Sequence, residues 1–136
     1  MTTTPGAAAN APPVTLPGYP YNRPHPISWS DLHHVCHGDP DDEEKGGHLH
    51  GTGRPDKTEF PPSWDDELVA KALTKVATHP AELDERGNSN WFATGTHDGV
   101  TVTAVVRPDG SIAAGWPDSG PGVRRNPPSR NPPRRR

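Results

Sequence analysis

The chain has a single cysteine among its 136 residues, so no disulfide can form within it and its redox compartment stays undetermined. It has no apolar run of about 20 residues, the length that a membrane-spanning helix needs. The N-terminus also lacks the basic and apolar stretches of a Sec signal peptide. Only 29% of the residues are hydrophobic, whereas 19 are proline and 14 are glycine. Much of the chain therefore cannot pack into a core.

Proline and arginine are concentrated at the two ends of the chain. Residues 1–28 contain seven prolines and show no helical or strand period, and residues 121–136 contain five prolines and six arginines. Such segments are typical of extended or disordered polypeptide. We therefore predict a disordered Pro-rich linker at 1–28, one small domain at 29–123 and a basic Pro/Arg tail at 124–136.

The formal net charge of −3 hides an uneven distribution. Without the six arginines of the tail, eight basic and 17 acidic residues remain, which gives the body a charge of −9. An acidic body with a basic tail is not the usual pattern of a nucleic-acid-binding protein. The tail either contacts RNA or an acidic partner through its arginines, or is a solvated terminus.

Two helices are predicted from caps and apolar spacing. Ser28 or Ser30 caps a short helix that carries Leu32, Val35 and the first histidines, and Gly38-Asp39-Pro40 ends it. A longer helix is expected to begin at Ser63 and to stop before Pro80. Its apolar face follows i, i+3, i+4 spacing through Leu68, Val69, Ala72, Leu73 and Val76.

Three strands are predicted after the second helix, at residues 90–96, 100–108 and 111–116. The first two flank His97-Asp98-Gly99, which is typical of a tight hairpin turn. The expected fold is α+β, with a helix packed on a small antiparallel sheet.

Five of the eight histidines lie between residues 33 and 50, together with Cys36. One interpretation is a structural zinc site, although the spacing fits known zinc patterns poorly. A second is that these histidines are surface residues, as we expect for His25, His79 and His97 outside the cluster. A third is a pair of acid–base catalysts, because one neutral and one protonated imidazole can divide that work near neutral pH. Lys57 would then stabilise developing negative charge.

Three segments of the chain, "HVCHGD", "KGGHLHGTGRPDKTEFPPSW" and "GWPDSGPGV", resemble a known family. Their succession is similar to the bacterial EndoU-type endoribonuclease domain, which occurs at the C-termini of polymorphic and contact-dependent toxins. The resemblance covers about residues 30–123. It implies an EndoU/barnase-like α+β fold and a metal-independent endoribonuclease.

The resemblance also implies site residues. It places the catalytic histidines at His34 and His48 and the catalytic lysine at Lys57. The residues expected to contact the substrate are Gly46, Gly47, His50, Thr58 and Trp116. No metal or other cofactor is implied.

Near the end of the domain the chain departs from the family pattern. Ala114 and Trp116 stand where family members often carry a hydroxyl-bearing residue and a tyrosine. Tryptophan can stack on a base, but alanine offers no hydrogen bond, so a uridine preference does not follow. An alternative is therefore a degenerate EndoU-like domain that binds RNA without cutting it.

The implied reaction begins with attack of the ribose 2′-OH on the adjacent phosphorus. It yields 2′,3′-cyclic phosphate and 5′-OH ends, with His48 as base and His34 as acid. The family context implies a toxin effector that is secreted or delivered into a target-cell cytoplasm by a specialised route. Its partners would be RNA, with tRNA as one candidate, and a cognate immunity protein, and neither a membrane nor a second copy of the chain is expected.

Overall fold

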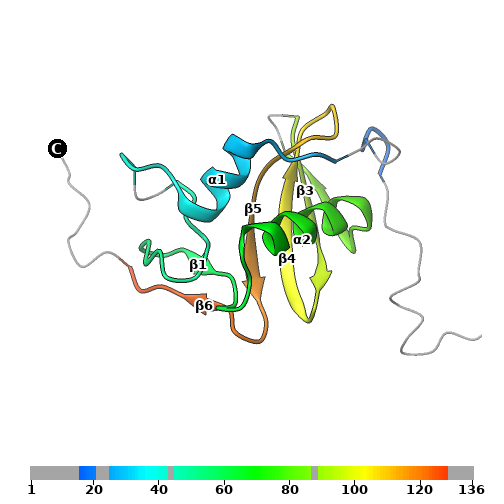
Figure 1. Ribbon diagram of the computed structural model, residues 1–136. Helices are drawn as coiled ribbons and strands as arrows, with labels where there is room; N and C mark the ends of the chain where they lie inside the picture. Colours follow the sequence, from blue (N-terminus) through cyan, green and yellow to red (C-terminus); the bar gives the residue numbers. More distant parts are fainter. Residues whose placement is uncertain (1–15, 21–24, 43–44, 87–88, 129–136) are drawn as a thin grey trace, which may run out of the picture.

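The protein is described here by a computed structural model that covers residues 16–20, 25–42, 45–86 and 89–128. The elements along these ranges are α1 (Trp29–His37), β1 (Thr58–Glu59), α2 (Asp66–Thr78), β2 (Glu82–Glu85), β3 (Trp91–His97), β4 (Val100–Val106), β5 (Ile112–Ser119) and β6 (Arg124–Arg125). An antiparallel sheet has the order β2-β3-β4-β5, and β1 pairs with β6 beside it (Figure 1). The predicted α+β fold is confirmed. No described helix has the length and apolar character needed to cross a membrane.

The hairpin of β3 and β4 follows the predicted turn. Asp98 and Gly99 both have positive φ, 51° and 80°, and His97 pairs with Val100 across them. Two such residues match the twist of a tight hairpin. Along β3 the side chains alternate between the buried Ala93 and the partly exposed Phe92. The sheet therefore has one covered face and one more open face.

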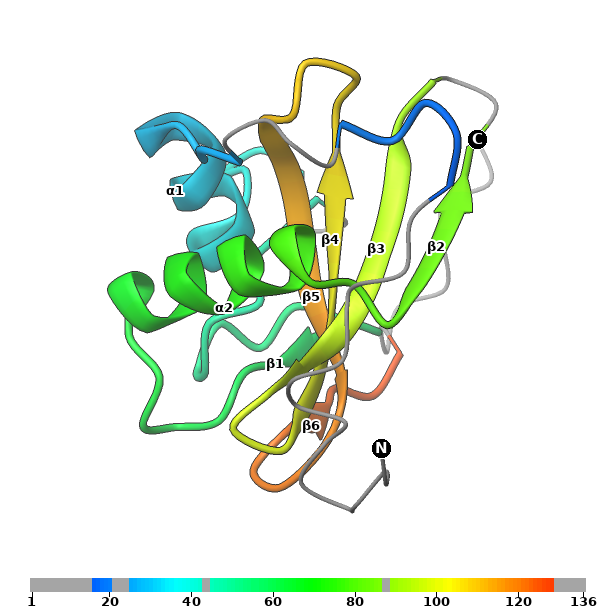
Figure 2. The same ribbon diagram turned by 90° about the vertical axis from the view of Figure 1, so that its right-hand side faces the viewer.

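Helix α2 covers one face of the sheet, crossing it in Figure 2. It begins at Asp66, not at the predicted Ser63, because the Asp65 carboxylate caps it by accepting from the Leu68 amide at 2.9 Å. The residues before the cap form a turn that buries Trp64. A Cβ at Gly115 would lie 2.3 Å from Leu73 Cδ2, so this glycine allows the close approach of α2 to β5.

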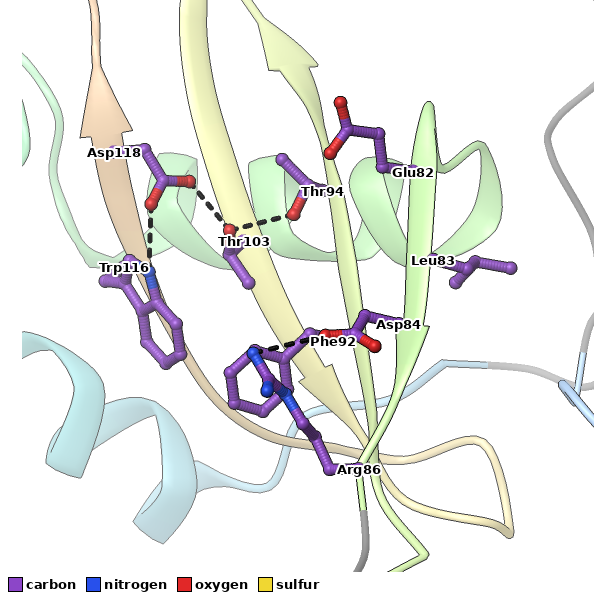
Figure 3. Close-up of a pocket in the computed structure, with 9 residues that line it drawn as sticks. All are labelled: Glu82, Leu83, Asp84, Arg86, Phe92, Thr94, Thr103, Trp116 and Asp118. Atoms are coloured by element: carbon purple, nitrogen blue, oxygen red, sulfur yellow. Dashed lines mark hydrogen bonds and ion pairs between the residues drawn. The ribbon is translucent and has the colours of Figure 1, made fainter.

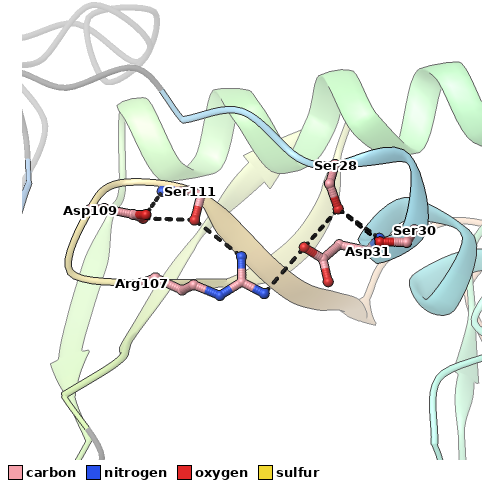
Figure 4. Close-up of polar contacts among 6 residues, drawn as sticks. All are labelled: Ser28, Ser30, Asp31, Arg107, Asp109 and Ser111. Atoms are coloured by element: carbon pink, nitrogen blue, oxygen red, sulfur yellow. Dashed lines mark hydrogen bonds and ion pairs between the residues drawn. The ribbon is translucent and has the colours of Figure 1, made fainter.

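Helix α1 lies beside β5, and of the two predicted caps it has Ser28, whose hydroxyl accepts from the Asp31 amide at 3.0 Å. Arg107 joins this helix to the turn between β4 and β5 (Figure 4). Its guanidinium donates to Asp31 Oδ2 at 3.2 Å and to Ser111 Oγ at 3.1 Å. The contact fixes the N-terminal end of α1 relative to the sheet.

Two parts of the predicted flanking segments lie on the domain. Tyr19 is buried, its ring packs edge-on against Trp91, and its hydroxyl donates to Ala77 O. The expectation of a surface position was wrong for His25, which is 6% exposed because it stacks on Tyr19 and its Nδ1 lies 2.9 Å from Gly110 O. His79 is exposed, but His97 is largely covered by Trp64. The domain boundaries stay a prediction, and residues 1–15 and 129–136 lie outside the described ranges.

Candidate functional site

A cleft of about 220 Å³ opens between β5 and the layer formed by α1 and the loop that follows it. Its lining residues come from four separate stretches of the chain: His34, Val35, Lys45, Gly46, His48, Lys57, Ala114, Gly115 and Trp116. The structure thus brings together both predicted catalytic histidines, the predicted lysine, Gly46 and Trp116. Of the described residues that line this cleft, none is acidic.

His48 is held from both its backbone and its ring. Its backbone amide donates to Val35 O at 2.7 Å, and its carbonyl accepts from the Phe60 amide at 2.7 Å. Ring atom Nδ1 lies 2.7 Å from Thr58 O. Because a carbonyl oxygen can only accept, Nδ1 carries the proton, and the neutral ring keeps its lone pair on Nε2.

The charge state of His48 follows from its burial. The residue is only 7% exposed, and this burial lowers its pKa to about 4. The Thr58 carbonyl opposes the shift, whereas the positive charges of Lys57 and His34 add to it. The imidazole is therefore neutral at pH 7, as a general base must be.

The lowered pKa of His48 predicts a loss of stability in acid. The unfolded chain takes up this proton near pH 6.5, whereas the folded chain resists it until about pH 4. The contribution of His48 is thus fully present above pH 6.5 and falls as the pH drops toward 4, by on the order of 3 kcal/mol. Urea unfolding at pH 7.5, 5.5 and 4.5 measures it against His48→Asn, which keeps an N–H for Thr58 O but does not titrate. Parallel pH profiles of the two proteins would contradict the prediction.

His34 lies near the C-terminal end of α1 and is partly exposed. Its Nδ1 lies 3.0 Å from Asp39 Oδ1. The carboxylate accepts from Nδ1–H and orients the ring, and a protonated ring in this orientation donates from Nε2. His34 therefore has the features of a general acid, and Asp39 those of the residue that orients it.

The segment that carries Asp39 is fastened by Arg54. The guanidinium donates to three backbone carbonyls, those of His37, Asp39 and Asp42, at 3.1, 2.9 and 2.7 Å. Because its guanidinium is hydrogen-bonded to backbone carbonyls of the protein, Arg54 supports the site and is not a free anion-binding group.

Two glycines let the loop before His48 pass close to α1. Gly46 has φ 72° and Gly47 has φ 82°. A Cβ at Gly46 would lie 2.1 Å from His34 O. The Gly47 amide donates to the carbonyls of His34 and Val35 at 3.2 and 3.1 Å. The two glycines thus bring the two histidines together, and Gly47 is not among the residues that line the cleft.

His50 and Thr58 are not among the residues that line the cleft. The Thr58 hydroxyl is buried and donates to Pro117 O at 2.5 Å, which joins β1 to β5. His50 Nδ1 lies 3.8 Å from Glu59 Oε1. The contacts of these two residues with substrate stay predictions. In the structure, Thr58 contacts β5 and His50 lies near Glu59.

Glu59 and Asn126 are supporting residues that the sequence analysis did not identify. The Glu59 side chain is 2% exposed, and its carboxylate accepts from the amides of Gly51 at 2.9 Å and Gly53 at 2.8 Å. Asn126 adds a donor at 2.9 Å. This carboxylate organises the loop after His48. In the sequence, Glu59 could have been noticed as a carboxylate in a short extended segment next to the apolar Phe60. Nothing in the sequence indicated a role for Asn126.

The zinc interpretation of the histidine cluster gains no support. Across residues 16–20, 25–42, 45–86 and 89–128, no group of three histidine, cysteine, aspartate or glutamate side chains is arranged to hold a metal ion. Burial raises the pKa of the Cys36 thiol to about 12, and the nearby carboxylates of Asp66 and Asp65 add to the shift. A thiol that resists ionisation is a poor metal ligand.

Comparison with known protein families identifies the domain. No curated protein and no solved structure matches the chain. The family described as bacterial EndoU nuclease matches residues 34–119. This match includes both histidines of the cleft, Lys57 and Trp116, and it covers more than half of the chain. The protein therefore belongs to the bacterial EndoU nuclease family.

Proposed function

We propose that this nuclease is a metal-independent endoribonuclease with a two-histidine mechanism. The observation that carries the proposal is the pairing of two differently prepared imidazoles in one cleft. His48 is buried, neutral and free at Nε2, and His34 is partly exposed and paired with a carboxylate. Two titratable groups whose environments differ in this way are suited to act as base and acid.

In the proposed reaction, His48 Nε2 takes the proton of the ribose 2′-OH. The O2′ atom then forms a bond to the adjacent phosphorus, and the bond from phosphorus to O5′ breaks. His34 gives its Nε2 proton to the departing O5′. Lys57, and Lys45 on the same cleft, supply positive charge for the phosphoryl oxygens. The products are a 2′,3′-cyclic phosphate and a 5′-OH end.

Trp116 supports a nucleobase position at this cleft. Its ring centroid lies 6.5 Å from that of His48, so a base stacked on the indole would place its ribose near the imidazole. Ala114, on the same strand, has no hydrogen-bonding side chain. No hydroxyl group at that position is therefore available to recognise one particular base.

The test of the proposed function is cleavage in EDTA. We expect the purified protein to cut an RNA oligonucleotide under chelation and to leave the DNA of the same sequence intact, because DNA lacks the 2′-OH nucleophile. Mass spectrometry should show 2′,3′-cyclic phosphate ends, and a polynucleotide kinase should label the new 5′-OH ends. Cleavage that requires an added metal, or equal cleavage of DNA, would contradict the mechanism. RNA binding without any cleavage would favour the alternative of a binding domain.

We also propose that the domain is a bacterial toxin effector. In this role it is secreted or delivered into a target-cell cytoplasm, and an immunity protein that covers the cleft protects the producing cell. The resemblance to toxin-associated EndoU domains supports this role. Growth of bacteria in which the domain is induced in the cytoplasm tests it.

A further inference from the structure

A second cavity, of about 330 Å³, lies next to the cleft on the open face of the sheet (Figure 3). Residues of β2, β3, β4 and β5 and the adjoining Arg86 line it: Glu82, Leu83, Asp84, Arg86, Phe92, Thr94, Thr103, Trp116 and Asp118. The strand register aligns Thr94 with Thr103 and Thr103 with Trp116. Trp116 lines both cavities, so a chain bound at the histidines can continue into this second cavity.

Aromatic groups form one wall of the cavity. The rings of Phe92 and Trp116 meet edge to face, with centroids 5.4 Å apart. The Arg86 guanidinium lies 4.2 Å from the centre of the Phe92 ring, and it is also 3.3 Å from the Asp84 carboxylate. Flat apolar and guanidinium surfaces of this kind are those on which unstacked bases rest in RNA complexes.

A chain of hydrogen bonds fixes the polar side of the cavity, and its direction can be assigned. The Asp118 carboxylate accepts from Trp116 Nε1 at 3.1 Å and from the Thr103 hydroxyl at 2.7 Å. Since Thr103 gives its proton to Asp118, the Thr94 hydroxyl must donate in the 3.0 Å contact between the two threonines. Thr94 Oγ1 and both oxygens of Asp118 keep free lone pairs. This side of the cavity therefore presents acceptors.

The charges of the two cavities differ in sign. The described ionisable residues of the cleft are histidines and lysines, which suits a phosphate. The second cavity has three carboxylates, from Glu82, Asp84 and Asp118, against the single guanidinium of Arg86. A phosphate is disfavoured there by like charge. A group with N–H donors and a flat ring is favoured.

We propose that this second cavity is a subsite for a guanine base next to the cleaved bond. Guanine presents two donors side by side, N1–H and the N2 amino group, and the two oxygens of the exposed Asp118 carboxylate match them. Adenine, cytosine and uracil each place an acceptor beside the donor on that edge. The guanine ring would lie against the Trp116 indole, beside Phe92 and the Arg86 guanidinium that lies over it. This inference rests on the proposed ribonuclease function, because it assumes that the bound chain is RNA.

The test uses DNA oligonucleotides that contain a single ribonucleotide, so that only one bond can be cut. The ribonucleotide is first set to each of the four bases, and guanine, adenine, cytosine or thymine is then placed on its 5′ or 3′ side. We expect guanine at one of these two flanking positions to raise kcat/KM about tenfold over adenine at the same position. Inosine, which lacks the N2 amino group, should fall between them. In Asp118→Asn the guanine-to-adenine ratio should approach one.

Asp118→Asn is a matched change, because the amide can keep the contacts with Trp116 and Thr103 once the threonine pair reverses its direction. Glu85→Gln is the control: Glu85 is an exposed carboxylate on β2 outside the cavity, and its loss should leave the ratio unchanged. The same ratio is measured as Kd with 2′-fluoro oligonucleotides, which bind but cannot be cut. If the 2′-fluoro oligonucleotides bind with a preference for guanine but the oligonucleotides that contain a ribonucleotide are not cut, the ribonuclease proposal is wrong and the guanine subsite stands.

Cleavage and binding that treat all flanking bases alike would overturn the subsite and keep the ribonuclease. A labelled tetra-arginine peptide tests the other ligand that acceptors and aromatic rings favour. If the peptide binds, Asp118→Asn weakens that binding, and no base is preferred, the cavity instead takes a cationic side chain of a protein partner and the nucleobase inference is wrong.

Discussion

We expect His48→Asn to lower kcat/KM for RNA cleavage by about 1,000-fold or more while the domain stays folded. The reason is geometric. The asparagine amide can still donate to Thr58 O, as Nδ1 does now at 2.7 Å, but it has no group at the position of Nε2. The proposed general base is then missing, while the proposed acid, the lysines and the stacking surface remain. Single-turnover cleavage of an RNA oligonucleotide and a thermal unfolding curve measure the two parts of this prediction.

The control is His33→Asn. His33 precedes His34, the proposed acid, on α1, but it is exposed and does not line the cleft, so its loss should change the rate less than twofold. The pair also tests the toxin role. Induced in a bacterial cytoplasm, the wild type and His33→Asn should arrest growth, and His48→Asn should not. Equal cleavage rates for the wild type and His48→Asn would contradict the proposed mechanism. Normal growth of cells that contain the active wild type would contradict the toxin role.

The sequence alone identified several residues that line the cleft, but it did not identify the residues that support them. Histidines and lysines that reach into a cleft stand out as residue types, and the resemblance placed His34, His48 and Lys57 in motifs. The residues that hold them make contacts over long separations. Asn126 reaches Glu59 across 67 positions, and Thr58 reaches Pro117 across 59. Such pairings depend on how the elements pack, which no local pattern records.

The secondary structure shows the same division between local and distant causes. The α1 cap at Ser28 and the β3–β4 hairpin depend on neighbouring residues, and both were predicted correctly. The polar, exposed β2 has none of the apolar alternation that marks a strand, and it forms because β3 pairs with it. Likewise, β6 consists of two exposed arginines whose partner is β1. In both cases the segment becomes a strand because it pairs with a strand elsewhere in the chain.

Gly46→Ala should destabilise the domain by roughly 3 kcal/mol and lower kcat/KM by about 100-fold. About 1 kcal/mol comes from placing alanine at φ 72°, and the rest from a Cβ that would lie 2.1 Å from His34 O. The His34 oxygen belongs to the backbone of α1 and the Cβ is attached directly to the loop backbone, so the loop must move away from α1. That movement separates His48 from His34, and a displacement of about 1 Å between reacting groups is costly in rate. Urea unfolding and single-turnover cleavage measure the two effects.

Gly53→Ala separates the close approach from the backbone conformation. Gly53 has φ 69°, nearly that of Gly46, but a Cβ there would meet nothing within 4 Å. This variant should therefore lose only about 1 kcal/mol and keep its rate within a fewfold of the wild type. If both variants lost the same stability and the same activity, the contact between Gly46 and the end of α1 would not be what sets the distance between the two histidines. A large loss of rate in Gly46→Ala alone would show that the glycines before His48 serve the chemistry by letting the loop reach the helix.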